Sequence, residues 1–184
     1  CWSGNGVSPS TTAQRVYSFL SNTMDEGIWV WDISILSDLS ASNFRSTATV
    51  NTTAFGVGST EKLQAIADYE NSSHVYMVQC VTGKIFHGGL VEGASDLRVP
   101  AMKQNDVVRF CYDATASTLS ITINGKYLGV IFEGIPSGYS PVVVLTGERK
   151  TVRLLRVMHK PHNIQHKKQA SVEAEDGDKN NDRN

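Results

Sequence analysis

Residues 105–145 read NDVVRFCYDATASTLSITINGKYLGVIFEGIPSGYSPVVVL, and this stretch decides the fold. Residues 107–112 are rich in β-branched and aromatic side chains, and residues 119–123 alternate apolar with polar side chains, as a half-buried strand does. Asn124-Gly125 follows, and both residues tolerate the positive φ that a two-residue type I′ hairpin turn requires. The chain then returns through residues 127–132. The stretch therefore predicts an antiparallel β meander.

Another strand is predicted ahead of the meander, at residues 28–36. In a strand, Trp29, Trp31, Ile33 and Ile35 share one face. Because that face is entirely apolar, we expect it to point into the core. Two tryptophans two residues apart would also suit a stacking platform for sugars or single-stranded bases, but the two isoleucines beside them favour core packing.

Residues 151–158 (TVRLLRVM) are predicted to form the last strand of the sheet. A regular period of two places Val152, Leu154 and Arg156 on one face of this strand. The same period places the residues between them on the other face. We therefore expect Arg156 to lie on the side of Val152.

Short motifs in the meander resemble the C-terminal half of a SPRY domain, the core of the B30.2 module. In order, they are Asp106-Val107-Val108, Leu119-Ser120, Asn124-Gly125-Lys126, Leu128-Gly129-Val130, Gly134-Ile135-Pro136 and Tyr139-Ser140-Pro141. Earlier motifs keep the family order: Val30-Trp31-Asp32-Ile33, Phe55-Gly56-Val57-Gly58, His74-Val75-Tyr76, Thr82-Gly83-Lys84 and His87-Gly88-Gly89. The resemblance covers about residues 27–157. Residues 1–26 show no Leu-Asp-Pro signature of a PRY segment, so the resemblance indicates a SPRY domain rather than a full B30.2 module.

The overall composition suits one globular domain and argues against two kinds of partner. The chain has 184 residues, of which 40% are hydrophobic, and its 17 Lys and Arg against 18 Asp and Glu give a net charge of −1. Without a basic surplus to release counterions from a phosphate backbone, we expect no nucleic-acid partner. No apolar run approaches the length of a membrane span, so we expect no membrane partner either.

The cysteines indicate a reducing compartment. The chain has three, Cys1, Cys80 and Cys111, and an odd number without a short-spaced pair argues against a disulfide framework and a cysteine-based zinc site. Cys80 and Cys111 lie in apolar runs, where a free thiol is usually buried. We therefore expect a cytoplasmic location, with the nucleus as the alternative. The N-glycosylation triplets at Asn51 and Asn71 weigh little against this.

We divide the chain into three parts. Residues 1–26 are expected to be a lead-in that packs on the domain, and residues 27–160 to form the β-sandwich. Residues 161–184 contain only four apolar residues and cannot offset their ordering entropy by burial, so a disordered tail or linker is predicted there. Because the chain does not begin with Met, we expect it to be a fragment or a processed product, with other domains in a larger parent chain.

No group of residues has the spacing of a catalytic or metal site. His159, His162 and His166 lie close in sequence, but no cysteine or carboxylate stands at ligand spacing, so neither a metal nor another cofactor is predicted. No serine stands in a G-x-S-x-G elbow, and no cysteine has a histidine beside it. We therefore predict that the protein is not an enzyme.

Closely spaced strands with amphipathic alternation predict two antiparallel sheets packed face to face. The resemblance implies an all-β, bent, concanavalin-like jelly-roll sandwich that serves as a protein–protein interaction module. Loops at one end of a stiff sandwich can vary without disturbing its core, and their rigidity reduces the ordering cost of binding. The resemblance further implies a peptide or partner domain as the ligand, and an adaptor role such as substrate recognition within a larger ubiquitin-ligase-type protein.

Three groups of loop residues are the predicted partner contacts. Each group offers an aromatic or arginine anchor or adaptable polar side chains, the composition favoured at binding hot spots. The groups are Asn43, Phe44 and Arg45, then Tyr69, Asn71 and His74, and finally Tyr139. Two other functions stay open. A carbohydrate-binding, lectin-like sandwich would need exposed aromatics beside Asp or Asn, with calcium as a further option, for which residues 68–73 are the only suitable loop. A structural domain of a large assembly would need no free ligand.

Overall fold

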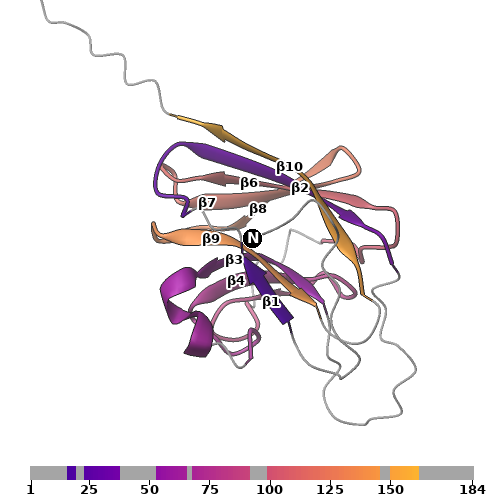
Figure 1. The fold of residues 1–184 in the computed structure, drawn as a ribbon, viewed down its shortest axis with the longest axis horizontal. Coiled ribbons are helices and arrows are strands. Elements are labelled where there is room, and N and C mark those ends of the chain that lie inside the picture. The colour runs from indigo at the N-terminus through magenta and orange to yellow at the C-terminus, as the bar shows by residue number, and fades with distance from the viewer. Residues whose placement is uncertain are drawn as a thin grey trace, which may run out of the picture.

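The protein is a sandwich of two antiparallel β-sheets, which confirms the predicted all-β fold (Figure 1). The computed structural model describes residues 16–19, 23–37, 53–65, 68–91, 99–145 and 150–161. One sheet, here called the β9 sheet, has the order β1-β9-β3-β4-β5, and the other, the β6 sheet, has the order β10-β2-β6-β7-β8. Strands adjacent in sequence often pair, but β9 inserts between β1 and β3, and β10 pairs with β2.

The strand bounds are as follows. The β9 sheet contains β1 (Val16–Phe19), β9 (Tyr139–Leu145), β3 (Ala54–Ser59), β4 (Val75–Gln79) and β5 (Ile85–Phe86). The β6 sheet contains β10 (Val152–Lys160), β2 (Ile28–Ile35), β6 (Val107–Asp113), β7 (Thr118–Ile123) and β8 (Lys126–Phe132). A short 3₁₀-helix, η1 (Thr60–Ala65), follows β3. It is the only helix among the described residues, and it is far too short to span a membrane.

The predicted meander is confirmed as β6, β7 and β8. Asn124 and Gly125 both have positive φ, 50° and 80°, as the type I′ turn requires. The Asn124 side chain also fixes the turn, since its Oδ1 accepts a hydrogen bond from the Val107 N–H (2.9 Å) and its Nδ2 donates to Asp106 Oδ1 (2.8 Å). The hairpin thereby fixes the register of the three strands.

The main core lies between the two sheets. Trp31, Ile33 and Ile35 are buried there as predicted, and Trp31 stacks on Phe110 of β6 with ring centroids 5.4 Å apart. Trp29 shares this face of β2 but is only partly buried, because it lies near the start of the strand at the margin of the core.

The β9 sheet is also buried on its outer face. A second apolar cluster covers that face, and it consists of Ala54, Tyr69, Val75, Met77, Phe86, Val142 and Val144. Strand β1 forms one edge of this sheet and pairs with β9, so this part of the predicted lead-in supplies a strand of the sandwich. Gly56 of β3 lies so close to β4 that a Cβ on it would come within 1.9 Å of the Tyr76 carbonyl oxygen. Only glycine fits this approach of two strands.

Candidate functional site

Five described loops gather at one end of the sandwich, which we call the loop end. They are residues 23–27, 68–74, 87–90, 113–117 and 133–138. The strand register places them together within each sheet, because Ile28 pairs with Asp113 in the β6 sheet, and Ser59 pairs with Tyr139 in the β9 sheet. The loop end therefore joins parts of the chain that are far apart in sequence.

Backbone hydrogen bonds tie these loops to one another and to the strands. They run from Met24 N to Tyr139 O (2.8 Å), from Ala114 N to Gly27 O (2.9 Å), from Ile135 N to Ser117 O (3.1 Å) and from Gly88 N to Ser72 O (3.0 Å). Each bond joins segments that are not neighbours in the chain. The loop end is consequently held in shape before any partner arrives, which lowers the entropy cost of binding.

The loop at residues 68–74 is also ordered from within. Asp68 Oδ1 accepts a hydrogen bond from the Glu70 N–H (3.0 Å), and Asp68 Oδ2 accepts one from Asn71 Nδ2 (2.7 Å). Ser72 Oγ accepts one from the His74 N–H (3.2 Å). These contacts form turns in which short polar side chains replace backbone partners. Asn71 is exposed and His74 is half-buried, so both predicted contacts are accessible, and their role in binding stays a prediction.

Tyr69 does not stand on the surface, and the expectation that it is an exposed anchor is wrong. Its side chain is fully buried against the outer face of the β9 sheet. The ring packs edge-on against Phe86 (5.9 Å between centroids), and its hydroxyl oxygen accepts a hydrogen bond from Gln79 Nε2 (3.1 Å). The outer face of β3, β4 and β9 is apolar and needs a cover, and Tyr69 supplies part of it. Tyr69 therefore pins the loop to the sheet.

Tyr139 is buried as well, so it is not the exposed loop contact that was expected. It begins β9 and is 8% exposed, in an aromatic cluster with Tyr76, Phe132 and His87 under the loop end. Tyr76 lies at the centre and contacts Tyr139 and Phe132 through ring edges, while the His87 ring stacks on it at 3.8 Å. His87 Nδ1 also lies 3.0 Å from the Val75 carbonyl oxygen. This cluster forms the floor of the loop end.

His87 is half-exposed above this floor, and the sequence interpretation did not select it as a contact. Its place in the His87-Gly88-Gly89 motif was the available signal. The first predicted group, Asn43, Phe44 and Arg45, lies outside the described residues.

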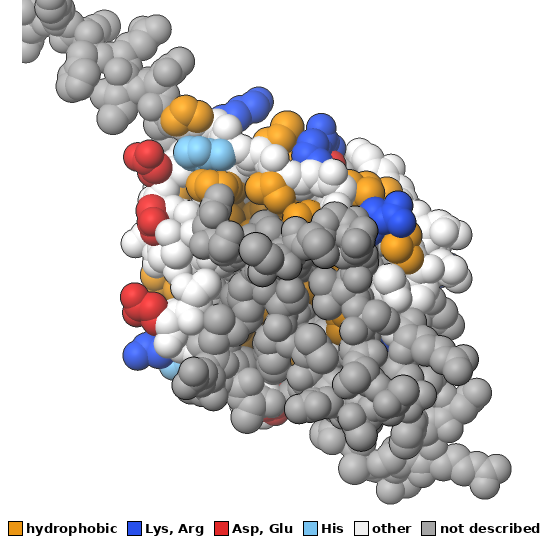
Figure 2. Space-filling view, in the orientation of Figure 1, with side chains coloured by type: hydrophobic (Ala, Val, Ile, Leu, Met, Phe, Trp, Pro, Cys, Tyr) orange, Lys and Arg blue, Asp and Glu red, His pale blue; other side chains and the backbone are white. Residues whose placement is uncertain are grey.

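The loop end is strongly acidic. Its five loops carry six carboxylates and neither lysine nor arginine. The carboxylates are Asp25, Glu26, Asp68, Glu70, Asp113 and Glu133. Figure 2 shows acidic side chains gathered along one edge of the molecule, on the left, where the start of η1 and the β6–β7 turn lie in Figure 1. Glu61 and Lys62 of η1 and Lys160 of β10 lie at the same end. Seven carboxylates then stand against two lysines, so the surface at this end still favours cations.

The pKa values of three buried tyrosine side chains beneath the loops are raised in this environment. Burial raises the pKa of Tyr112, and the nearby carboxylates of Asp25 and Asp113 raise it further. Burial also raises the pKa of Tyr76 and that of Tyr139. A protonated Tyr112 hydroxyl can donate to the carbonyl oxygens of residues 135 and 136, each 3.5 Å away. The phenols thus stay neutral and leave the negative charge to the loops.

The lectin alternative can be compared with this geometry. Within the described residues, no group of three His, Cys, Asp or Glu side chains is arranged to hold a metal ion. At the loop considered for calcium and sugar, both Asp68 oxygens accept hydrogen bonds from the protein, and Tyr69 faces inward. A lectin-like site needs the opposite, an exposed aromatic ring beside an available carboxylate. Residues 68–73 therefore give the lectin hypothesis no support.

Comparison with known proteins establishes the family. The family model described as "SPRY domain" matches residues 7–156. The chain belongs to the SPRY domain family. The SPRY match begins at residue 7, ahead of the motifs that carried the resemblance, and so includes β1. SPRY domains have a fold that serves as a protein-interaction module.

Solved SPRY domains share the fold. The SPRY domain of human HERC1 superposes with a TM-score of 0.64 at 18% sequence identity, over 82% of this chain and 87% of that one. A further human SPRY domain gives a TM-score of 0.59 at 15% identity, over 84% of this chain and 92% of that one. No curated protein matches the sequence. At these identities the likeness concerns the architecture and leaves the choice of partner to the surface of this chain.

Proposed function

We propose that this SPRY domain binds a protein partner through the loop end, and that the partner presents a basic segment. The observation that carries the proposal is the set of six carboxylates, without lysine or arginine, on five loops that hydrogen bonds hold in place. Complementary charge speeds the encounter with a cationic segment and disfavours acidic ones. Rigid loops also reduce the entropy that is lost when the partner binds.

Specific contacts come from the exposed part of the neighbouring loops 68–74 and 87–90. Asn71 offers adaptable hydrogen bonding, and His74 and His87 offer ring surfaces that are partly accessible. Leu90 is 46% exposed and supplies an apolar anchor. The bond from Gly88 N to Ser72 O holds the two loops together, so a single short peptide can reach all four side chains.

Membership of the SPRY family supports a proposal for the wider role. We propose that the domain recognises substrates or adaptor partners for a larger parent protein of the ubiquitin-ligase type, in the cytoplasm. Support for a reducing compartment comes from Cys80, which is a free, fully buried thiol whose pKa burial raises well above its ordinary value. Such a thiol is inert and packs as a small apolar side chain.

Peptide binding tests the proposal. A fluorescent peptide of alternating lysine and leucine residues should bind the protein with an affinity that falls as salt is added. The triple variant Asp25→Asn, Glu26→Gln, Glu133→Gln removes three exposed charges and should weaken binding about tenfold, since each exposed pair contributes about 0.5 kcal/mol. Arg153→Gln, which removes an exposed charge from β10, is the matched control and should bind as the wild type does. Equal affinity of the triple variant and the wild type would overturn the proposal.

A further inference from the structure

The outer face of the β6 sheet, here called the open face, has no cover among the described elements. Strands β6 and β7 alternate buried side chains that enter the core with half-exposed ones that point outward. The β9 sheet, in contrast, is buried on both faces. A sheet face with one side in solvent is ordinary in antiparallel proteins. What distinguishes this face is the chemistry at its centre.

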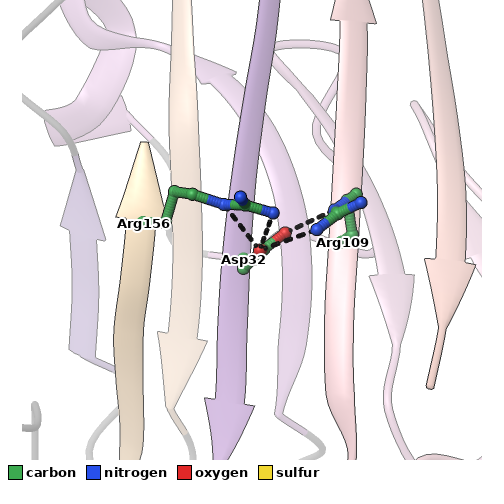
Figure 3. A network of polar contacts seen from close by, with 3 residues as sticks. All are labelled: Asp32, Arg109 and Arg156. Carbon is green, nitrogen blue, oxygen red and sulfur yellow. Dashed lines mark hydrogen bonds and ion pairs between the residues drawn. The ribbon is translucent and has the colours of Figure 1, made fainter. Parts of the chain in front are cut away.

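At that centre, one carboxylate lies between two guanidinium groups (Figure 3). Asp32 of β2 pairs across the sheet with Arg109 of β6 on one side and with Arg156 of β10 on the other. Arg109 Nε donates to Asp32 Oδ1 (2.7 Å) and its Nη2 to Oδ2 (3.1 Å), whereas Arg156 Nε (3.0 Å) and Nη2 (2.8 Å) both reach Oδ2. The Asp32 side chain is 8% exposed, so it is almost enclosed by its two partners.

The two arginines carry more positive charge than Asp32 balances, and more N–H donors than Asp32 accepts from. Each guanidinium has five N–H groups, and in each only the Nε and one Nη contact Asp32. The side chains of Arg109 and Arg156 are 44% and 42% exposed, so their other N–H groups are accessible from outside. Asp32 holds both guanidinium groups in position, and two charges of one sign face a single opposite charge. An incoming carboxylate would balance them.

The imbalance extends over the whole β6 sheet. All charged residues that lie in strands belong to this sheet, and the β9 sheet strands have none. The β6 sheet has five cations, Arg109, Lys126, Arg153, Arg156 and Lys160, and two anions, Asp32 and Asp113. Figure 2 shows Lys and Arg side chains along the upper side of the molecule, where β10 and β2 lie in Figure 1. Strand register places Arg109, Arg153, Arg156 and Lys160 on the open face together with Asp32 and Asp113, whereas Lys126 pairs with the core residue Ile123. Among the described residues, the open face therefore has four cations and two anions.

An apolar row lies beside the two arginines. Strand register brings Met158, Val30, Cys111, Ser120 and Val130 into line across β10, β2, β6, β7 and β8. Val130 is 41% exposed, and the others are half-buried. The row is thus accessible apolar surface, broken only by a serine hydroxyl. On β8, Tyr127 is 62% exposed and pairs with Thr122, which in turn pairs with Arg109.

We propose that the open face is a second docking surface, and that its occupant is an acidic segment of a partner protein with apolar side chains between the acids. A carboxylate would take the free N–H groups of Arg109 and Arg156, and an apolar side chain of the segment would pack on the row from Met158 to Val130. Charge complementarity selects this occupant, because the open face carries two more cations than anions. A nucleic acid suits the face less well, since exposed apolar surface and the Asp32 carboxylate both disfavour a phosphate backbone. The open face adjoins the loop end at Asp113 and Lys160 and has the opposite charge preference.

The test uses the full chain and two labelled probes. Fluorescence anisotropy would follow a peptide of alternating glutamate and leucine, and a single-stranded oligonucleotide of equal charge. The peptide should bind the wild type and bind Val130→Glu about tenfold more weakly, because the new carboxylate repels it at an exposed site that the fold does not need. Arg109→Lys together with Arg156→Lys keeps both charges beside Asp32 but loses the planar forks, and should weaken the peptide several-fold.

The matched control is Leu90→Glu. Leu90 is as exposed as Val130 but lies at the loop end, so this variant should leave the acidic peptide unaffected. Three results would overturn the proposal: no binding of the peptide to the wild type, equal losses in Val130→Glu and Leu90→Glu, or binding of the oligonucleotide as tight as that of the peptide. Because the basic peptide of the previous section addresses the other surface, Val130→Glu should leave its binding unchanged, and failure at one surface does not imply failure at the other.

Discussion

Trp29 and His159 stack face to face, with ring centroids 4.1 Å apart, and both rings direct a nitrogen at one carbonyl oxygen. Trp29 Nε1 lies 2.8 Å and His159 Nε2 3.0 Å from the Glu26 oxygen. A carbonyl can only accept, so His159 donates from Nε2. The two rings thereby fasten the end of β10 to the start of β2, beside an acidic loop of the loop end.

Removing the His159 ring should loosen this fastening. We expect His159→Ala to lower the free energy of unfolding by about 1 kcal/mol, the sum of a modest stacking contribution and one exposed hydrogen bond. Urea denaturation measures this change. His159→Phe is the control, since it keeps a ring on Trp29 but lacks the donor, and should fall between the wild type and His159→Ala. If both variants were as stable as the wild type, the stack would contribute nothing to the attachment of β10.

Asp32 should make the stability of the protein depend on acid pH. Hydrogen bonds from Arg109 are the main cause that lowers the pKa of Asp32 below its ordinary 3.8, with Arg156 adding to the effect and burial opposing it. A carboxyl group with a lowered pKa in the folded state stabilises the fold fully above its ordinary value, and this contribution is lost as the pH falls below 3.8 through the folded pKa.

Asp32→Asn should therefore be less stable than the wild type at pH 7, by about 1–2 kcal/mol, because both arginines are exposed enough for water to replace part of the lost interaction. The difference should shrink as the pH falls below 3.8. Urea denaturation at a series of pH values between 7 and about 2 gives both results. A difference between the two proteins that stayed constant down to the lowest pH would contradict the ion-pair explanation.

Gly56 should not tolerate even a methyl group. In Gly56→Ala the added Cβ would meet the Tyr76 carbonyl oxygen at 1.9 Å, so β3 and β4 must separate. We expect a loss of at least about 3 kcal/mol of unfolding free energy. Gly125→Ala is the comparison, since its Cβ would have open space and only the left-handed φ of 80° is unfavourable. That variant should lose about 1–2 kcal/mol, and thermal denaturation of the pair would show whether strand spacing dominates over φ.

Tyr69 should matter for stability rather than for contact. Tyr69→Phe removes the hydroxyl that accepts from Gln79 Nε2 and should lower the free energy of unfolding by about 1 kcal/mol. Tyr69→Ala also removes the ring from the outer cluster and should lower it by about 3–5 kcal/mol. In both, urea denaturation gives the stability, and Tyr69→Phe should bind the basic peptide with unchanged affinity. If the Tyr69→Phe variant is fully folded and still binds the peptide more weakly than the wild type, the hydroxyl contacts the partner after all.

The meander and the core strand could be predicted because their signals are local. Asn124-Gly125 specifies its turn through the φ values that it permits, and alternation places Trp31 and Ile33 in the core. Arg156 shows where local periodicity fails. A register shift between Leu154 and Arg156 adds a residue to β10, so Arg156 lies opposite Asp32 on the open face and not on the side of Val152 as predicted.

The two proposed binding surfaces could not be predicted from the order of residues along the chain. Tyr69 and Tyr139 stand among turn-forming residues, and only the three-dimensional arrangement shows that both rings face inward. The acidic loop end is assembled from five separate segments, and the Asp32 pairs join three strands, so neither forms a run that composition or spacing could detect. That loops at one end contact the partner stays a prediction, and of the predicted residues that the structure describes, Asn71 and His74 are accessible.

The loop end and the open face differ in the sign of their charge, so the charge of the described residues is unevenly distributed although the net charge of the chain is only −1. In a concentrated solution, the acidic loop end of one copy would attract the basic open face of another. We therefore expect the solubility of the domain to be lowest in dilute buffer and to rise when modest salt is added, because salt screens the attraction between copies. A nearly neutral protein with evenly distributed charge would show the reverse.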